Sequence, residues 1–304
     1  ADSMNYILNY QAQNPDKYLF LDNDMFLIND FNSEKYEKYS CAIVLQSKNN
    51  CQTNYFWNGL YYFDMEKLNL NKVGVIWGSG IGGLKTFEDE MIYFGQGDGT
   101  PKINPFFIPK MIADIAPAHI SMRNGFMGPN YTTVSACASS ANAMIDAFNY
   151  IRLGMCDVIV SGGSEAAVTI AGMGGFNSMQ ALSTRNDSPE TASRPFDANR
   201  DGFVLGEGAG ALVFEEYEHA KARGANILAE VAGAGMTADA YHITSPHPDG
   251  LGATNVMKRA LRDAGMNPVD IDYVNVHGTS TPLGDVAESK AIKNVFGDHS
   301  YNLN

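Results

Sequence analysis

Long apolar runs, cysteine and net positive charge are all scarce in this chain of 304 residues. No apolar run reaches the ~18 residues that a membrane-spanning helix needs, and no charged and apolar leader is visible. Only four cysteines are present, Cys41, Cys51, Cys137 and Cys156, without the spacing of a disulfide framework or metal site. The formal net charge of -13 argues against non-specific binding of nucleic acid. We therefore expect a cytoplasmic, reduced, globular protein with no membrane span.

Glycine is nearly absent from residues 1–70, which contain only Gly59 of the 30 glycines. Residues 41–45 are a plausible strand, and little else in this segment is periodic. The shift in composition sets residues 1–70 apart from the rest of the chain. Two explanations stay open: a divergent added segment, or a translated frameshift or assembly error, which the abruptness of the shift favours.

Residues 130–165 form the most informative stretch. A short β-prone run over 131–136 is followed by small and apolar residues at helical spacing over 138–153, which end at Gly154. A second apolar strand is expected over 158–160, with Gly162 and Gly163 as its stop. Cys137 lies at the junction between the first strand and the helix.

That junction has chemical meaning for Cys137. The first turn of a helix has unpaired N–H groups and the positive end of the macrodipole, so a thiolate there is stabilised and can act as a nucleophile. The same N–H groups can hold an oxyanion beside the sulfur. The alternative is a buried, inert cysteine, as most free cysteines are.

A glycine loop over residues 78–83 follows a buried-type strand over 73–77 and precedes an expected helix over 84–94. It matches G-x-G-x-x-G, so a dinucleotide site is a rival hypothesis. The acidic residue that should follow about 20 residues later is replaced by a glycine-rich loop over 95–101. Tight packing between strand and helix explains the glycines equally well.

Four motifs occur in order: Ser-Ala-Cys-Ala-Ser-Ser around Cys137, Ser-Gly-Gly-Ser-Glu at 161–165, a charged glycine-rich run over 193–210, and Val-His-Gly-Thr-Ser-Thr around His277. From about Lys72 to Asn304 the chain resembles the β-ketoacyl-[acyl carrier protein] synthases of the elongating, type II fatty-acid kind. The resemblance implies a thiolase-like α/β fold of two similar halves in five α-β-α-β-α layers. Residues 71–225 would form the first half, with the nucleophile, and 226–304 the start of an incomplete second half.

The resemblance also implies a reaction, a decarboxylative Claisen condensation. Cys137 would take the acyl group from acyl carrier protein, and malonyl-carrier protein would then lose CO2 and extend the chain. His277 would stabilise the enolate or thioester oxygen, and Thr279 and Thr281 would hydrogen-bond the pantetheine amides. Phosphopantetheine would arrive on the carrier, so neither a metal nor a nucleotide is expected.

Two aromatic residues match substrate-pocket positions of that family: Phe107 would line the acyl pocket, and Phe176 would gate the nucleophile. From the sequence alone, each could equally be an ordinary core aromatic. Phe107 lies in an expected helix over 104–125, and Lys102 matches a basic position for docking the carrier. The charged residues of 193–210 are expected to form a structural ion-pair network. None of the six histidines makes a metal pair at helical spacing.

Three expectations concern assembly and completeness. The family resemblance implies a homodimer. It also implies a second histidine and a lysine in a loop after Asn304, so the chain is expected to be truncated and unable to complete the condensation. A discrete ketosynthase of a polyketide pathway and a non-catalytic fragment remain as alternative functions.

Overall fold

The computed structural model describes residues 18–20, 25–28, 42–44 and 68–303, so most of the segment 1–70 lies outside the described residues. The described strands form one hydrogen-bonded sheet in the order β5-β4-β6-β7-β3-β8-β2-β1-β9. They are β1 (Tyr18–Phe20), β2 (Met25–Ile28), β3 (Ala42–Val44), β4 (Val73–Gly78), β5 (Asn130–Thr133), β6 (Val158–Glu165), β7 (Gly208–Glu215), β8 (Ala229–Ala234) and β9 (Tyr273–Asn275). The helices are α3 (Leu84–Gly95), α4 (Phe107–Met111), α5 (Ile115–Asn124), α6 (Ser139–Arg152), α7 (Ile170–Ser178), α8 (Tyr217–Ala222), α9 (Leu251–Ala264) and α10 (Pro282–Phe296).

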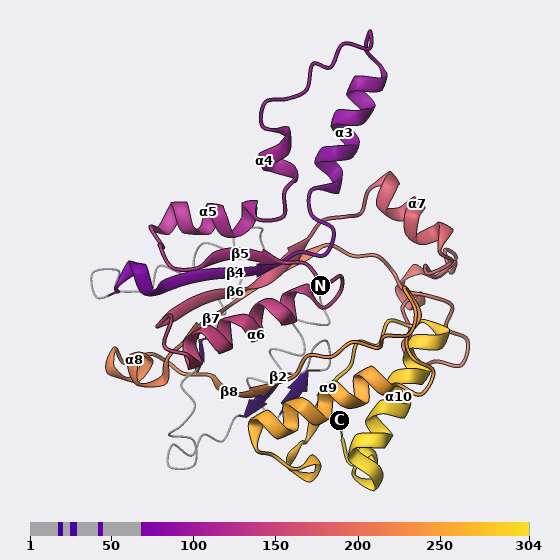
Figure 1. The fold of residues 1–304 in the computed structure, drawn as a ribbon. Helices are drawn as coiled ribbons and strands as arrows, with labels where there is room; N and C mark the ends of the chain where they lie inside the picture. Colours follow the sequence, from indigo (N-terminus) through magenta and orange to yellow (C-terminus); the bar gives the residue numbers. More distant parts are fainter. Residues whose placement is uncertain (1–17, 21–24, 29–41, 45–67, 304) are drawn as a thin grey trace.

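The first part of the sheet, β5-β4-β6-β7, lies between α5 and α6 (Figure 1). Strands β5, β4 and β6 are parallel, and β7 runs antiparallel to β6. Because side chains alternate along a strand, Val75 and Val160 pack in the cluster on the α5 face, whereas Ile76 and Ile159 pack in the α6 cluster. The near-continuous apolar runs of β4 and β6 therefore fill two cores.

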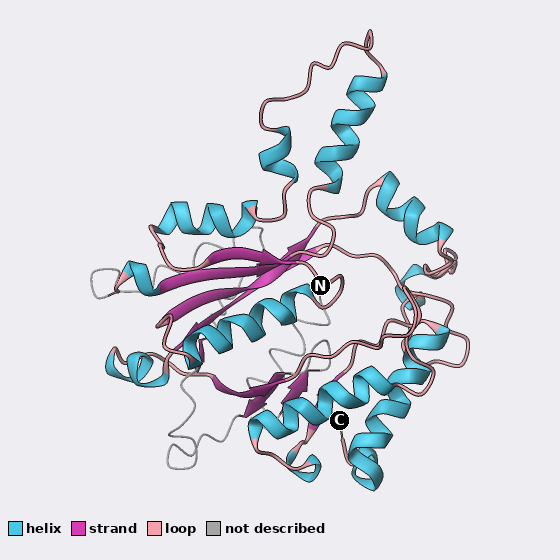
Figure 2. Ribbon diagram, viewed as in Figure 1, coloured by secondary structure: helices cyan, strands magenta, loops and turns pink. Residues whose placement is uncertain are grey.

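The second part of the sheet repeats this arrangement around β8. Val231 packs in the same cluster as α6, whereas its neighbour Ala232 packs with α9 and α10 on the other face. Helix α6 thus lies in the middle of five layers: α5, the first part of the sheet, α6, the second part, and α9 with α10 (Figure 2). This matches the expected α-β-α-β-α arrangement. The two parts are also hydrogen-bonded to each other through β3, which pairs with both β7 and β8.

Two local expectations were wrong. Strand β6 does not stop at Gly162 and Gly163 but continues through them to Glu165. The expected helix over 104–125 is two helices, because the backbone at Ile112 is extended and ends α4. The glycine-rich stretch before Phe176 forms part of α7, which begins with the side chain of Thr169 accepting a hydrogen bond from the Gly172 N–H.

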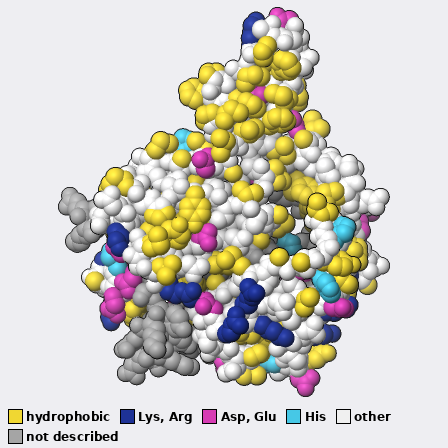
Figure 3. All heavy atoms as spheres, viewed as in Figure 1, with side chains coloured by type: hydrophobic (Ala, Val, Ile, Leu, Met, Phe, Trp, Pro, Cys, Tyr) yellow, Lys and Arg dark blue, Asp and Glu magenta, His cyan; other side chains and the backbone are white. Residues whose placement is uncertain are grey.

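Helices α3 and α4 project from the rest of the molecule as an arm that we call the α3–α4 arm, residues 84–111 (Figure 1). The rings of Phe87 and Phe107 stack within it, with centroids 6.2 Å apart. Apolar side chains cover its surface (Figure 3), and Tyr93 and Phe106 are each 64% exposed. Among the described residues, no helix is long and apolar enough to cross a membrane.

Candidate active site

Cys137 lies between β5 and α6, two residues before the helix begins, and is exposed. The residue before it, Ala136, has a left-handed φ of 54°, which is strained for a residue with a Cβ. The hydroxyl of Ser139 donates to the Ala136 carbonyl at 2.7 Å and accepts from the Ser135 N–H at 2.8 Å. One buried serine therefore holds both sides of the turn that presents the thiol.

Two glycines let the start of α6 lie directly on the sheet. A Cβ at Gly78, the last residue of β4, would meet the Ser140 nitrogen at 2.3 Å. A Cβ at Gly163 of β6 would meet the Ser140 hydroxyl at 1.9 Å. Any side chain at either position would push α6, and with it Cys137, away from the strands. This contact explains why β6 continues through a glycine pair that reads as a strand stop.

The glycine loop after β4 is occupied by a side chain of the protein itself. The Glu165 carboxylate accepts from the N–H groups of Gly80, Ile81 and Gly82 at 2.8, 2.7 and 3.1 Å. In a dinucleotide site these amides would be directed at a phosphate. Here these N–H groups donate to a carboxylate at the end of β6 and are not available to a phosphate. This argues against the rival hypothesis of a nucleotide site.

His277 follows β9 and is exposed. The carboxylate of Glu288, in α10, accepts from the backbone N–H groups of His277 and Gly278 at 2.7 and 2.9 Å. In Figure 1 the start of α6 and the start of α10 lie on the same side of the molecule. The fold thus presents the turn of Cys137 and the loop of His277 toward one side, each from a different layer.

The loop of His277 is held by the charged run over 193–203. Asp285, only 1% exposed, pairs with Arg200 at 3.1 Å and accepts from the Phe196 N–H at 2.7 Å. Ser280, fully buried, accepts from the backbone N–H groups of Arg194 and Gly202. The predicted structural ion-pair network is confirmed.

Asp201 is a further member of this network. Hydrogen bonds from the Ser183 hydroxyl and the Thr184 N–H, together with the charge of Arg194, lower the pKa of Asp201 to about 2. It is therefore ionised across the physiological range and pairs with Arg194 throughout.

The two predicted threonines lie beside each other at the start of α10. The hydroxyls of Thr279 and Thr281 are 2.9 Å apart, and Thr281 also accepts from the Gly284 N–H at 3.3 Å as the N-cap of the helix. The structure therefore brings Thr279 and Thr281 together with His277 in one loop. Thr281 has a structural role as well.

The predicted pocket residues lie on separate elements. Phe107 belongs to the α3–α4 arm, half-buried against Phe87. Phe176 belongs to α7, where its ring meets the edge of Phe203 with centroids 5.2 Å apart. Lys102 is exposed in the segment between α3 and α4. The ring contact joins α7 to the charged run, which in turn holds the loop of His277.

The two described cysteines differ sharply. Cys156 is 1% exposed, and burial raises its pKa to about 11, so it stays a thiol at neutral pH. Cys137 is exposed at the start of a helix. Cys41 and Cys51 lie outside the described residues. Within the described part of the chain, no cluster of three or more His, Cys, Asp or Glu side chains could hold a metal ion.

Comparison with known proteins identifies the family. The model of the β-ketoacyl synthase N-terminal domain matches residues 60–220, and that of the C-terminal domain matches residues 228–304. The chain belongs to the β-ketoacyl synthase family. It is 49% identical over 239 residues to a 3-oxoacyl-[acyl-carrier-protein] synthase 2 of Synechocystis sp. and 48% identical over 240 residues to one of Staphylococcus aureus. These matches cover 79% of this chain but only 57% and 59% of the two relatives.

Solved structures of β-ketoacyl synthases share the fold. A β-ketoacyl synthase from Burkholderia phymatum has a TM-score of 0.71 at 37% identity, and the match covers 78% of this chain and 57% of that one. A type II polyketide acyl-carrier protein in complex with its ketosynthase has a TM-score of 0.75 at 32% identity, over 78% of this chain and 59% of that one. The thiolase-like fold class predicted from the sequence is therefore confirmed.

The sequence alone did not indicate which residues hold these loops. Glu165 and Ser139 lie within two of the four motifs, but neither motif assigns them this role. Asp285 and Glu288 belong to no pattern that points to the loops they hold. A signal existed for Glu165, because a carboxylate at the end of a strand beside a glycine loop is placed to accept backbone N–H groups.

Proposed function

We propose that this chain is a 3-oxoacyl-[acyl carrier protein] synthase of fatty-acid elongation, with Cys137 as the acylated nucleophile. The observation that carries the proposal is the presentation of an exposed thiol by the strained, serine-held turn at the start of α6. The thiolate of Cys137 attacks the acyl thioester, the carrier thiol leaves, and the acyl group remains on the sulfur. The Cys137 N–H, at the start of the helix, stabilises the oxyanion formed in that step.

His277 acts in the second stage of the proposed reaction. When malonyl-carrier protein loses CO2, the imidazole donates a hydrogen bond to the oxygen on which negative charge develops. The new enolate carbon then attacks the acyl group on Cys137 and releases the thiol. The Glu288 carboxylate fixes the backbone of His277 and so supports the position of the ring.

Thr279 and Thr281 have different roles in this proposal. Here Thr281, which accepts from the Gly284 N–H, donates its own hydroxyl proton to Thr279, 2.9 Å away. Thr279 can then donate its proton to a pantetheine carbonyl. We assign Thr279 to direct contact with the substrate arm and Thr281 to its positioning.

The acyl pocket and the partners belong to the same proposal. Phe107 lines the acyl pocket, and Phe176 controls access to Cys137. Acyl carrier protein delivers the substrate on its phosphopantetheine arm. The apolar surface of the α3–α4 arm supports a homodimer, since an exposed apolar patch of this kind marks a protein interface. Residues 71–225 and 226–304 would belong to the two ketosynthase halves of a cytoplasmic enzyme.

A polyketide ketosynthase remains the second candidate, because a polyketide ketosynthase complex is among the similar structures. Identity favours the fatty-acid assignment: 48–49% to the 3-oxoacyl-[acyl-carrier-protein] synthases 2 against 32% to the polyketide ketosynthase.

The test of the nucleophile is acyl transfer followed by peptide mapping. The chain is exposed to labelled acyl-carrier protein, and the label is expected on Cys137 and to be lost in Cys137→Ala. Cys156→Ala is the matched control and should retain it, because that thiol is buried and protonated. Label on Cys156, or none on a folded chain, would contradict the assignment.

The test of His277 separates the two stages. In an enzyme that spans the full length of the relatives, His277→Ala should lower malonyl decarboxylation about 10²–10³-fold, the effect of removing one oxyanion donor, and affect acylation of Cys137 less. His119→Ala, on the exposed side of α5, is the control and should change neither. Equal losses in both stages would show that this division of roles is wrong.

A further inference from the structure

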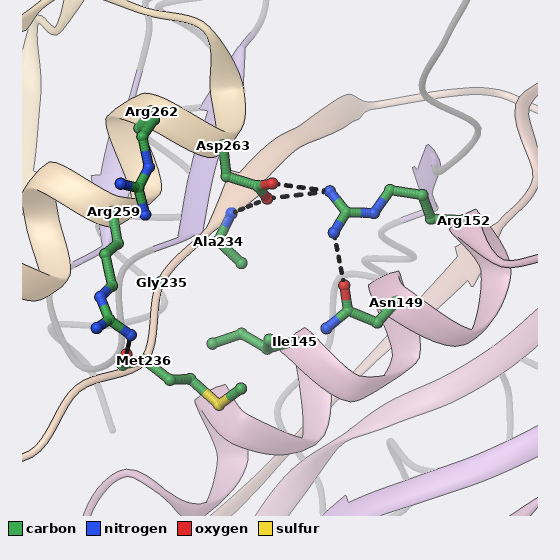
Figure 4. A pocket seen from close by; sticks show the side chains of 9 residues that line it. All are labelled: Ile145, Asn149, Arg152, Ala234, Gly235, Met236, Arg259, Arg262 and Asp263. Atoms are coloured by element: carbon green, nitrogen blue, oxygen red, sulfur yellow. Dashed lines mark hydrogen bonds and ion pairs between the residues drawn. The ribbon is translucent and has the colours of Figure 1, made fainter.

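A cavity of about 520 Å³ lies between α6, α9 and the chain that follows β8. Its lining residues are shown in Figure 4: Ile145, Asn149 and Arg152 from α6, Ala234, Gly235 and Met236 after β8, and Arg259, Arg262 and Asp263 from α9. It is separate from the turn of Cys137, because Arg152 is at the opposite end of α6. The cavity is open to solvent, and both Arg259 and Arg262 are exposed at its mouth; its volume is in the range of small-molecule sites.

The charge of this cavity is unusual for the molecule. Three guanidinium groups and one carboxylate line it, which gives +2 in a chain whose formal net charge is -13. The carboxylate, Asp263, is already neutralised: it accepts from Arg152 at 2.9 and 3.1 Å and from the Ala234 N–H at 3.0 Å. The two remaining guanidinium groups therefore determine the charge of the cavity.

Neither remaining arginine has a carboxylate partner among the described residues. Arg259 donates to the Met236 carbonyl at 3.0 Å, which is a neutral acceptor, and Arg262 makes no ion pair with any residue that the structure describes. The two are three residues apart on α9, so they are neighbours on one helix face and repel each other. A bound anion would remove this repulsion.

The wall that carries these groups is built tightly. A Cβ at Gly235 would meet the Val256 carbonyl oxygen at 2.5 Å, so the backbone after β8 lies directly on α9. This contact brings the Met236 carbonyl to Arg259 and fixes that guanidinium at the rim (Figure 4). Ile145, Ala234 and Met236 add apolar surface beside the charges.

We propose that this cavity binds a small phosphorylated molecule, with its phosphate held by Arg259 and Arg262. A phosphate dianion matches the two uncompensated charges, and the planar fork of a guanidinium matches phosphate oxygens in pairs. The apolar residues contact the rest of the ligand. This site is independent of the proposed acyl transfer at Cys137.

The experiment is a calorimetric titration of the whole chain with inorganic phosphate at low ionic strength, without any acyl substrate. Saturable binding is expected, weaker at high salt. Arg259→Ala and Arg262→Ala should each weaken it about tenfold, the effect of losing one charge-assisted contact. Lys258→Ala removes the same charge from an exposed position of α9 outside the cavity and should have no effect.

The other outcomes are equally decisive. Absence of saturable binding by the folded chain overturns the proposal, as does an equal loss in Lys258→Ala, which would indicate a general charge effect. Succinate that binds as tightly as phosphate would show that the site takes dianions of any kind and is not a phosphate site. If Arg262→Ala fails to fold, Arg262→Lys, which keeps the charge but not the planar fork, must still weaken binding.

Discussion

The carboxylate of Glu165 allows the sharpest prediction about stability, because substitutions at this position can remove its hydrogen bonds in two steps. It accepts three backbone hydrogen bonds: the Oε2 atom takes those from Gly80 and Ile81, and Oε1 takes the one from Gly82. Glu165→Gln can keep one oxygen at the Oε2 position and so retain two of the three bonds. Glu165→Ala loses all of them.

The expected losses follow from the number of bonds. A hydrogen bond to a charged group contributes about 1.5–3 kcal/mol, and partial solvent access places these bonds at the lower end of that range. We expect Glu165→Gln to lower the free energy of unfolding by about 1.5 kcal/mol. For Glu165→Ala we expect about 3 kcal/mol, because water satisfies part of the freed N–H groups.

Urea unfolding followed by circular dichroism measures both values, with an unchanged dependence on urea concentration as the sign that only stability has changed. Glu218→Gln is the matched control, since that side chain is 71% exposed on α8 and its contact with Lys221 is a surface pair at 3.8 Å. The reasoning is refuted if Gln and Ala cost the same, or if neither costs more than the control.

Two further predictions concern the packing of α6 and a buried acid. Gly78→Ala places a Cβ 2.3 Å from the Ser140 nitrogen, so we expect a loss of about 3 kcal/mol and slower alkylation of Cys137 by iodoacetamide. Gly174→Ala, inside α7 and meeting nothing within 4 Å, is the control and should lower neither the stability nor the rate of alkylation. Burial raises the pKa of Glu230 to about 7 from its ordinary 4.5, so the folded chain binds its proton more tightly and stability falls as pH rises from about 4.5 through about 7. Glu230→Gln should therefore match the parent at pH 4 and exceed it by about 3 kcal/mol at pH 8 in urea unfolding, and an equal difference at both pH values would contradict the assignment.

The elements that the sequence predicted best are those whose limits are set locally. Helix α6 was expected over 138–153 and runs from Ser139 to Arg152, because Gly154 adopts the left-handed backbone that ends a helix. Strand β4 was found where its apolar run placed it. Strand β6 was misjudged because its glycines serve a contact with α6, which no local pattern reveals.

The residues of the candidate site also differ in how far the sequence predicts them. Cys137 and His277 were proposed as site residues from their motifs, and the network around Arg194 and Arg200 was predicted from its mixed charges. The acceptors that hold the loops, such as Glu288 and Asp285, belong to a helix whose sequence explains them as ordinary surface and core positions. Their roles depend on which loop packs on the helix, and this is decided by tertiary structure.

The spacing of these contacts along the chain also sets the order in which the site can form during synthesis. The turn of Cys137 is local, since its bonds from Ser139 and Asn142 span only three to seven residues. The bonds from the glycine loop to Glu165 span up to 85 residues, and those from Arg200 to the start of α10 span 81 and 82. Contacts of such separation form late, because the intervening chain must first be closed into a loop. A growing chain can therefore form the turn of Cys137 well before the loop of His277 exists, and in that interval the exposed thiol is open to oxidation.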